Sequence, residues 1–199
     1  MKRKESFWKN KLSIIDKIIY YFRVKKIERK YDFTNKSIID FWCWYNAKFL
    51  SYINEKYTTK KLIAFDLLLN KKHLESIWVK CYEWDLNNEF TIKEDIDITI
   101  GTAILEHLSN PICFLKSCYK ILPEWWYLLL TVPSVRSKPI LEFMAYKLKI
   151  IDKREIEDHK KYYKKESLVN ELLQAWFKKE NIKHSYFEFF MNNFVLVKK

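Results

Sequence analysis

The feature that most restricts how this chain can fold is its single glycine, Gly101, among 199 residues. A globular domain of this length ordinarily contains about 14 glycines, because turns and helix ends use their conformational freedom. The chain contains eight tryptophans instead. Some bacterial genetic codes assign UGA to glycine, and a gene of that kind translated with UGA as tryptophan would show this imbalance. We therefore predict glycine-like sites, in turns or at element ends rather than in the core, at Trp42, Trp44, Trp78, Trp84, Trp125, Trp126 and Trp176.

Length and composition favour one folded domain. The chain is 49% hydrophobic, which is enough for a full core and argues against disorder. No run approaches the roughly 18 apolar residues of a membrane-spanning helix, and the charged residues 1–5 are not followed by an export signal. The cysteines show no C-x-x-C spacing and lie in apolar surroundings, so we expect reduced thiols, a cytoplasmic protein and no metal site. They are Cys43, Cys81, Cys113 and Cys118.

The net charge of +12 comes mainly from lysine. It indicates either attraction to a polyanion, such as RNA or an anionic membrane surface, or the codon usage of an AT-rich gene. The second interpretation is favoured because lysines are spread along the whole chain. No RNP pattern or GXXG loop is present.

Residues 1–36 are predicted to form a helical extension. Leu12, Ile15, Ile19 and Phe22 recur at helical spacing, which gives an apolar stripe. We expect this stripe to pack on its own domain, with peripheral contact to a membrane as the alternative.

Strands and helices alternate from residue 37 onward. Strands are predicted at 37–41, 61–65, 79–83, 97–102 and 127–132, and two more at 182–189 and 194–198. Helices are predicted at 47–56, 71–76, 112–121 and 166–175. This alternation is typical of a mostly parallel sheet covered on both faces, and the last two strands favour an antiparallel hairpin at its edge. Residues 37–199 are therefore predicted to be one α/β domain, a three-layer sandwich with a seven-stranded sheet.

Acidic residues end three successive predicted strands, at Asp40, Asp66 and Asp85. One such residue is usually part of a solvated turn, but three at the edge where open α/β sheets bind ligands indicate a binding site. Asp66, at the tip of the second strand, is placed to accept hydrogen bonds from two ribose hydroxyls. With glycine at Trp84, Asp85 and the amide of Leu86 can face an adenine ring.

Four segments then resemble one family. With glycine at 42 and 44, Ile38–Trp44 reads I-I-D-F-G-C-G, similar to the D-x-G-C-G loop of class I S-adenosylmethionine (SAM) dependent methyltransferases. Thr102–Leu108 resembles the A-x-x-x-L-E-H-L segment of the methyltransferase type 11/12 families, and Leu122–Leu128 their L-x-P-G-G-x-L turn. Asp158–Tyr163, followed by Ala175–Phe177, resembles the late E-H-x-x-x-Y…A-G-F segment.

The resemblance implies a Rossmann-like fold over residues 37–199 and SAM as the cofactor. The cofactor contacts that it implies are Asp40, Trp42, Cys43, Trp44, Asp66, Leu67, Asp85, Leu86, Thr102, Ala103 and His107. The predicted activity is methyl transfer to an O, N or C atom of a small molecule. SAM carries the reactive methyl, so the protein mainly aligns donor and acceptor.

Two histidines are the candidate catalytic residues. His107 follows the fourth strand, where structural support of the cofactor pocket is the favoured role. His159 borders the expected acceptor site and is either a general base or a structural residue. Arg136 and Lys138 are candidates for holding an anionic acceptor, and the predicted helix 139–151 is a lid for an apolar one or a simple cover of the sheet.

Two alternatives remain. Real indoles at Trp42 and Trp44 would block the pocket, as in a non-catalytic methyltransferase-like binding protein. An RNA methyltransferase is supported by the positive charge alone, since a base-methylating N-P-P-Y motif is absent from the sequence.

Overall fold

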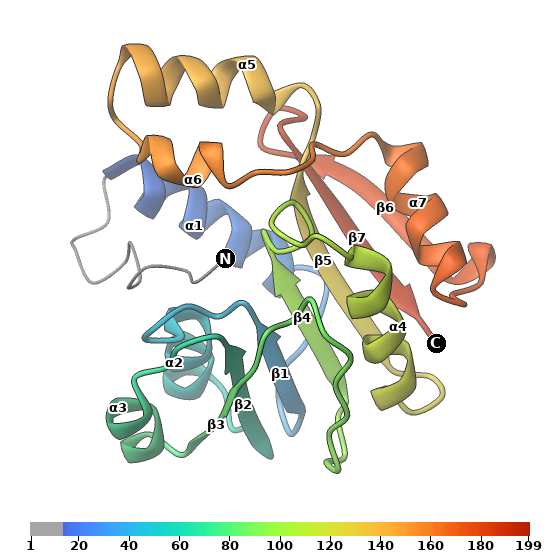
Figure 1. Cartoon of the computed structure of the whole chain (residues 1–199). Coiled ribbons are helices and arrows are strands. Elements are labelled where there is room, and N and C mark those ends of the chain that lie inside the picture. The colour runs from blue at the N-terminus through green and yellow to red at the C-terminus, as the bar shows by residue number, and fades with distance from the viewer. Residues whose placement is uncertain (1–13) are drawn as a thin grey trace.

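The computed structural model describes residues 14–199 and shows one seven-stranded sheet in the order β3-β2-β1-β4-β5-β7-β6 (Figure 1). Strands β1 to β5 are parallel, and β7 runs antiparallel to both β5 and β6. This arrangement confirms the predicted α/β sandwich with an antiparallel edge hairpin. The strands are β1 (Ser37–Phe41), β2 (Lys61–Asp66), β3 (Val79–Glu83), β4 (Ile98–Thr102), β5 (Tyr127–Pro133), β6 (Ile182–Phe187) and β7 (Asn192–Lys198).

Most helices match the predicted ranges within two residues. The α-helices are α1 (Ile14–Glu28), α2 (Lys48–Lys56), α3 (Lys71–Ser76), α4 (Pro111–Ile121), α5 (Ser137–Glu142), α6 (Lys153–Glu157) and α7 (Lys165–Gln174). The predicted lid helix 139–151 is α5 followed by a π-helical segment, η2 (Phe143–Lys147), and it ends before Lys149, whose φ is 54°. The sequence did not predict helix α6. A short 3₁₀ helix, η3 (Lys179–Asn181), precedes β6.

Side chains that alternate along β1 divide the core into two layers. Ile39 packs in a buried cluster with Leu115 of α4 and Leu168 of α7. Ile38, which points to the opposite face, packs with Leu50 of α2 and Ile27 of α1. Helices therefore cover both faces of the sheet (Figure 1).

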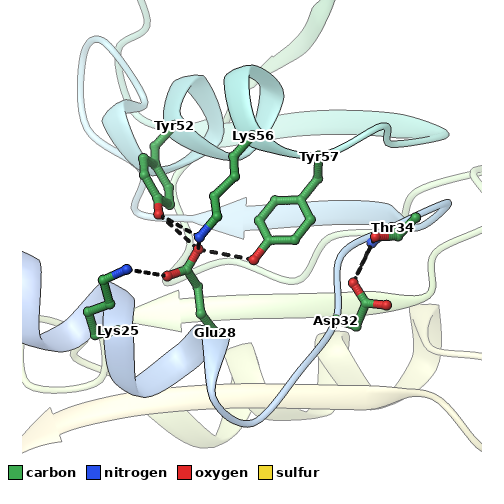
Figure 2. Close-up of polar contacts among 7 residues, drawn as sticks. All are labelled: Lys25, Glu28, Asp32, Thr34, Tyr52, Lys56 and Tyr57. Carbon is green, nitrogen blue, oxygen red and sulfur yellow. Dashed lines mark hydrogen bonds and ion pairs between the residues drawn. The ribbon is translucent and has the colours of Figure 1, made fainter.

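Helix α1 is held to α2 by Glu28, whose carboxylate accepts hydrogen bonds from three side chains within residues 52–57 and from Lys25 of α1 itself (Figure 2). The hydroxyls of Tyr52 and Tyr57 donate at 2.9 and 3.0 Å, and Nζ of Lys56 at 2.5 Å. Burial raises the pKa of Glu28, but the hydrogen bonds from Lys56, Tyr52 and Tyr57 outweigh it and bring this pKa down to about 2. Glu28 therefore remains a carboxylate at neutral pH.

The inner face of α1 differs from the predicted stripe. Val24 and Ile27 are buried, whereas Phe22 is 54% exposed. The prediction that Phe22 packs on the domain was wrong, because Val24 and Ile27 form the buried side of the helix. Ile19 of the predicted stripe lines a cavity together with Tyr20 and Arg23. Leu12 lies outside the described residues, and nothing is described of the side chain of Ile15. Over residues 14–199, no helix has the length and apolar character needed to cross a membrane.

Five tryptophans adopt a left-handed backbone conformation. Trp42, Trp44, Trp78, Trp125 and Trp176 have φ between 62° and 75°, the region that favours glycine because a Cβ is strained there. All five lie in turns outside the strands and helices. These conformations are what the glycine hypothesis requires.

Trp176 illustrates the requirement most clearly. Its amide donates to the carbonyl of Leu173, and the amide of Phe177 donates to the carbonyl of Leu172, both at 3.1 Å. These two bonds form a Schellman motif at the end of α7, in which Trp176 occupies the C′ position that is usually glycine.

The other predicted positions fit less uniformly. Trp84 and Trp126 also lie in connections between elements, but neither is among the positive-φ residues. Trp42 is only 6% exposed and packs in the core cluster, so the prediction that it stays out of the core was wrong. Its side chain is buried because it packs against this cluster and stacks on the ring of His107.

Candidate active site

A cavity of about 210 Å³ lies at the carboxyl ends of β1, β4 and β5. Helices α1, α5 and α6 gather beyond the ends of β4 and β5 (Figure 1), and each contributes lining residues. Ligands of open α/β sheets bind at this edge. The sequence-predicted residues that line the cavity are Asp40, Trp42, Cys43, Trp44, Thr102, Ala103, His107 and His159.

The sequence analysis missed several lining residues, and three of them carry buried polar groups. Tyr20 and Arg23 come from α1, and Glu188 comes from the turn between β6 and β7. No motif marks them. The only available signal was the placement of Arg23 within an otherwise apolar stretch of the predicted helix.

Several buried polar atoms of the cavity wall have no hydrogen-bond partner within the part of the chain that the structure describes. Leaving such atoms unsatisfied is costly, so their clustering at one cavity indicates a polar ligand. They are Tyr20 Oη, Arg23 Nε, Asp40 Oδ1, Glu106 Oε2 and Glu188 Oε1.

The cavity is acidic in a protein of net charge +12. Among the described residues, its lining includes the carboxyl groups of Asp40, Glu106, Asp158 and Glu188 against the basic groups of Arg23 and Lys48. Burial, and secondarily the charge of Asp66, raises the pKa of Asp40 well above its usual range. Burial also raises the pKa of Glu106, to about 7. A cationic ligand would stabilise the ionised form of both groups.

Asp66 supports the loop that follows β1. Its Oδ2 accepts a hydrogen bond from the amide of Trp44 at 2.8 Å, and its Oδ1 accepts one from the amide of Leu67 at 2.7 Å. Asp66 and Leu67 do not line the cavity, whereas Trp44 does. The residue at position 44 therefore stands at the boundary between the cavity and the predicted ribose-binding carboxylate.

Asp85 and Leu86 also lie outside the cavity. Asp85 is exposed and accepts hydrogen bonds from the amide and side chain of Asn87, while Leu86 is buried in the core. Thr102 and Ala103 line the cavity at the end of β4, where Ala103 has a φ of 53°. The structure thus brings together at the cavity the predicted residues that follow β1 and β4, and leaves those that follow β2 and β3 outside it.

The two candidate catalytic histidines are neighbours. Their ring centroids lie 4.9 Å apart. Nδ1 of His107 lies 2.8 Å from Oδ2 of Asp158, and Nδ1 of His159 lies 3.1 Å from the hydroxyl of Tyr162. Burial, together with the nearby His107, lowers the pKa of His159 to about 4. His159 is therefore a neutral imidazole at physiological pH.

The indole of Trp42 lies against one of these two histidines. It stacks on the imidazole of His107, with centroids 5.1 Å apart and planes 21° apart. The side chain at position 42 therefore occupies space between the β1 loop and the histidine pair.

The candidates for an anionic acceptor lie elsewhere. The guanidinium carbon of Arg136, an exposed residue, lies 5.4 Å from the ring centroid of Phe190. Nζ of Lys138 lies 3.9 Å from Oε1 of Glu142. Neither basic residue lines the cavity. Residues 137–157, which include α5, η2 and α6 and are called the lid segment below, instead contribute apolar side chains, namely Leu141, Ile151 and Ile156.

Comparisons with known proteins agree with this geometry. No protein-family model matches the chain, and no curated protein matches its sequence. Solved structures do match. A SAM-dependent methyltransferase from Archaeoglobus fulgidus is 15% identical with a TM-score of 0.63, over 94% of this chain and all of that one.

Two further solved structures match this chain. One from Mesorhizobium loti is 11% identical with a TM-score of 0.63, over 89% of this chain and 96% of that one. PigF, solved with SAH (the demethylated product of SAM), is 11% identical with a TM-score of 0.68, over 92% of this chain but 56% of PigF. The chain therefore has the fold of class I SAM-dependent methyltransferases.

Proposed function

We propose that this protein is a SAM-dependent methyltransferase that acts on an O, N or C atom of a small molecule. The observation that carries the proposal is the acidic cavity at the ends of β1 and β4, with its buried unsatisfied polar atoms. SAM is a cation at its sulfonium and ammonium groups and an anion at its carboxylate. A wall with both Asp40 and Arg23 matches this combination.

The proposal includes glycine at positions 42 and 44. The cavity of about 210 Å³ is smaller than the roughly 300–1,000 Å³ of most small-molecule sites. Both tryptophans line it with a backbone conformation that favours glycine. Without the two indoles, the cavity would enlarge toward Asp66 and toward His107.

The cofactor supplies an activated methyl group, and the residues of this chain supply its placement. In our proposal, Asp40 faces the ammonium group of SAM and Arg23 faces its carboxylate. The adenosine is contacted by the residues that follow β2 and β3, namely Asp66, Leu67, Asp85 and Leu86. Thr102, Ala103 and His107 border the transferred methyl. Because a pKa of about 4 makes a weak base at neutral pH, we assign His159 a positioning role.

The acceptor is proposed to be small and apolar. Leu141, Ile151 and Ile156 form the wall that the lid segment adds, and an apolar molecule would bury surface against them. The free thiols of all four cysteines support a cytoplasmic location.

Calorimetric titration with SAH tests the proposal. The double variant Trp42→Gly/Trp44→Gly should bind SAH at least tenfold more tightly than the chain as printed. Trp125→Gly, a positive-φ residue that is 68% exposed and lies outside the cavity, is the matched control and should not change the affinity. Failure of the folded double variant to bind SAH or SAM would overturn the proposal in favour of a non-catalytic protein.

Peptide mass spectrometry of the protein from its natural host tests the glycine substitution separately. Peptides spanning residues 40–46 should have masses that correspond to glycine at 42 and 44. Tryptophan masses there would show that the indoles are native.

A further inference from the structure

Three side chains at the bottom of the cavity converge on one point. The carboxylate of Glu106 and the rings of His107 and His159 each offer a ligand atom, and these atoms all lie within 4.8 Å of one another. Metal–ligand bonds of about 2.1 Å place the ligand atoms of a tetrahedral site roughly 3.4 Å apart. Binding of an ion would therefore draw these three atoms closer together than they are now.

Glu106 provides an independent sign of a missing partner. The residue is 1% exposed, and its Oε2 has no hydrogen-bond partner among the described residues. A buried carboxylate oxygen without a donor is unfavourable unless a cation approaches it. Glu106 lines a cavity that also contains the carboxyl groups of Asp40, Asp158 and Glu188.

The histidines are oriented as metal ligands usually are. Nδ1 of His107 is engaged by Asp158 at 2.8 Å, and Nδ1 of His159 by the hydroxyl of Tyr162 at 3.1 Å. Nε2 of each ring is therefore the atom available to a ligand. A carboxylate behind a ligating histidine fixes its tautomer and raises its basicity.

The two loops that supply the ligands are fastened together. The amide of Lys160 donates to the carbonyl of Glu106 at 2.7 Å, and Nζ of Lys160 donates to the carbonyl of His107 at 2.6 Å. These bonds tie the turn after β4 to the segment after α6. The ligand geometry is thus held by backbone contacts rather than by the ligands themselves.

We propose that Glu106, His107 and His159 bind a first-row divalent transition-metal ion such as Zn²⁺. Two imidazoles and one carboxylate suit these ions better than Mg²⁺ or Ca²⁺, which prefer oxygen ligands. Three protein ligands leave a coordination position open toward the cavity. Sequence reasoning predicted no metal because it considered cysteine spacing, and His159 is far from Glu106 in the sequence.

The role of the ion rests on the proposed function. An acceptor hydroxyl at the open position would lose its proton to solvent more readily, because the ion lowers its pKa. Its oxygen would then form the new bond to the methyl carbon as the carbon–sulfur bond breaks and its electron pair stays on sulfur. The acceptor class that fits is an apolar molecule with a hydroxyl group.

Equilibrium dialysis of the metal-free protein with Zn²⁺ tests the site, with Co²⁺ absorption as a second readout. We expect one ion per chain, and at least a tenfold loss of affinity in Glu106→Gln and in His159→Ala. Asp158→Asn, which keeps all three ligands, should weaken binding about 10–100-fold. His73→Ala, an exposed histidine outside the cavity, is the matched control and should bind normally.

Absence of stoichiometric binding would overturn the site, as would unchanged affinity in folded His159→Ala and Asp158→Asn. SAH titration of the metal-free glycine variant separates the two proposals. SAH binding without metal binding removes only the metal site, and metal binding without SAH binding removes only the methyltransferase assignment.

Discussion

The amide of Trp176 donates a hydrogen bond to the carbonyl of Leu173 at 3.1 Å, in the turn that ends α7. In the same turn, the amide of Phe177 reaches the carbonyl of Leu172 because Trp176 adopts a φ of 73°, a conformation that glycine adopts without strain. The same conformation recurs at Trp78, after α3, where the side chain is 90% exposed. Trp78 therefore isolates the backbone effect from side-chain packing.

Trp78→Gly should stabilise the protein. Relief of the left-handed strain is worth about 1 kcal/mol in the free energy of unfolding. Trp78→Ala removes the same indole but keeps the strain, so it should gain little. Denaturant unfolding of both variants measures the difference, and equal stabilities would show that position 78 does not require glycine.

Asp66→Ala should lower stability as well as SAH affinity. The substitution leaves the amides of Trp44 and Leu67 without their acceptor, at a cost of about 1–3 kcal/mol. Denaturant unfolding reports the first effect and calorimetry on the glycine variant the second. Reduced stability with unchanged SAH affinity would restrict Asp66 to a structural role.

Asp40→Asn should weaken SAM binding in the glycine variant at least tenfold. The substitution replaces a 2% exposed carboxyl group that lines the cavity, so this group can no longer ionise opposite the ammonium of SAM, and a buried charge pair depends strongly on both partners. Asp95→Asn, an exposed aspartate away from this cavity, is the control for lost charge. Similar affinities in the two variants would place the ammonium elsewhere.

Glu28 should make stability depend on pH in the acidic range. Its pKa is about 2 in the folded protein against an ordinary value of 4.5. Its contribution is therefore complete above pH 4.5 and is lost as pH falls through about 2. Thermal unfolding of the wild type and of Glu28→Gln should differ most at neutral pH and converge toward pH 2. A difference that stays constant over this range would show that ionisation of Glu28 is not coupled to folding.

The sheet was predictable because β1, β2, β4 and β5 are short, mostly apolar segments and polar or turn-forming residues separate the strands. The boundaries of β1 and β3 match the prediction, and the tail hairpin pairs as expected. The rotation of α1 was not predictable, since apolar residues surround that helix on nearly all sides and only tertiary contacts select Val24 over Phe22.

The site was predictable only where its residues follow strands. Asp40 and Thr102 could be placed from strand ends, because parallel strands end at one edge. The pairing of His107 with Asp158, 51 residues apart, depends on how the lid segment folds back across the sheet. Arg23 lines the cavity but belongs to a helix without a recognisable motif, so its place in the site could not be predicted.

Helix α1 joins the domain through Glu28 at its C-terminal end, while Tyr20 and Arg23 form part of the cavity wall. Arg23 is the side chain that we propose for the carboxylate of SAM, so cofactor affinity would depend on the contacts that hold α1 in place. Glu28 does not line the cavity, yet loss of its hydrogen bonds would shift Arg23 and weaken cofactor binding indirectly. In the proposed enzyme, cofactor affinity is thus controlled from a position remote from the cofactor, while the acceptor wall of Leu141, Ile151 and Ile156 can change independently.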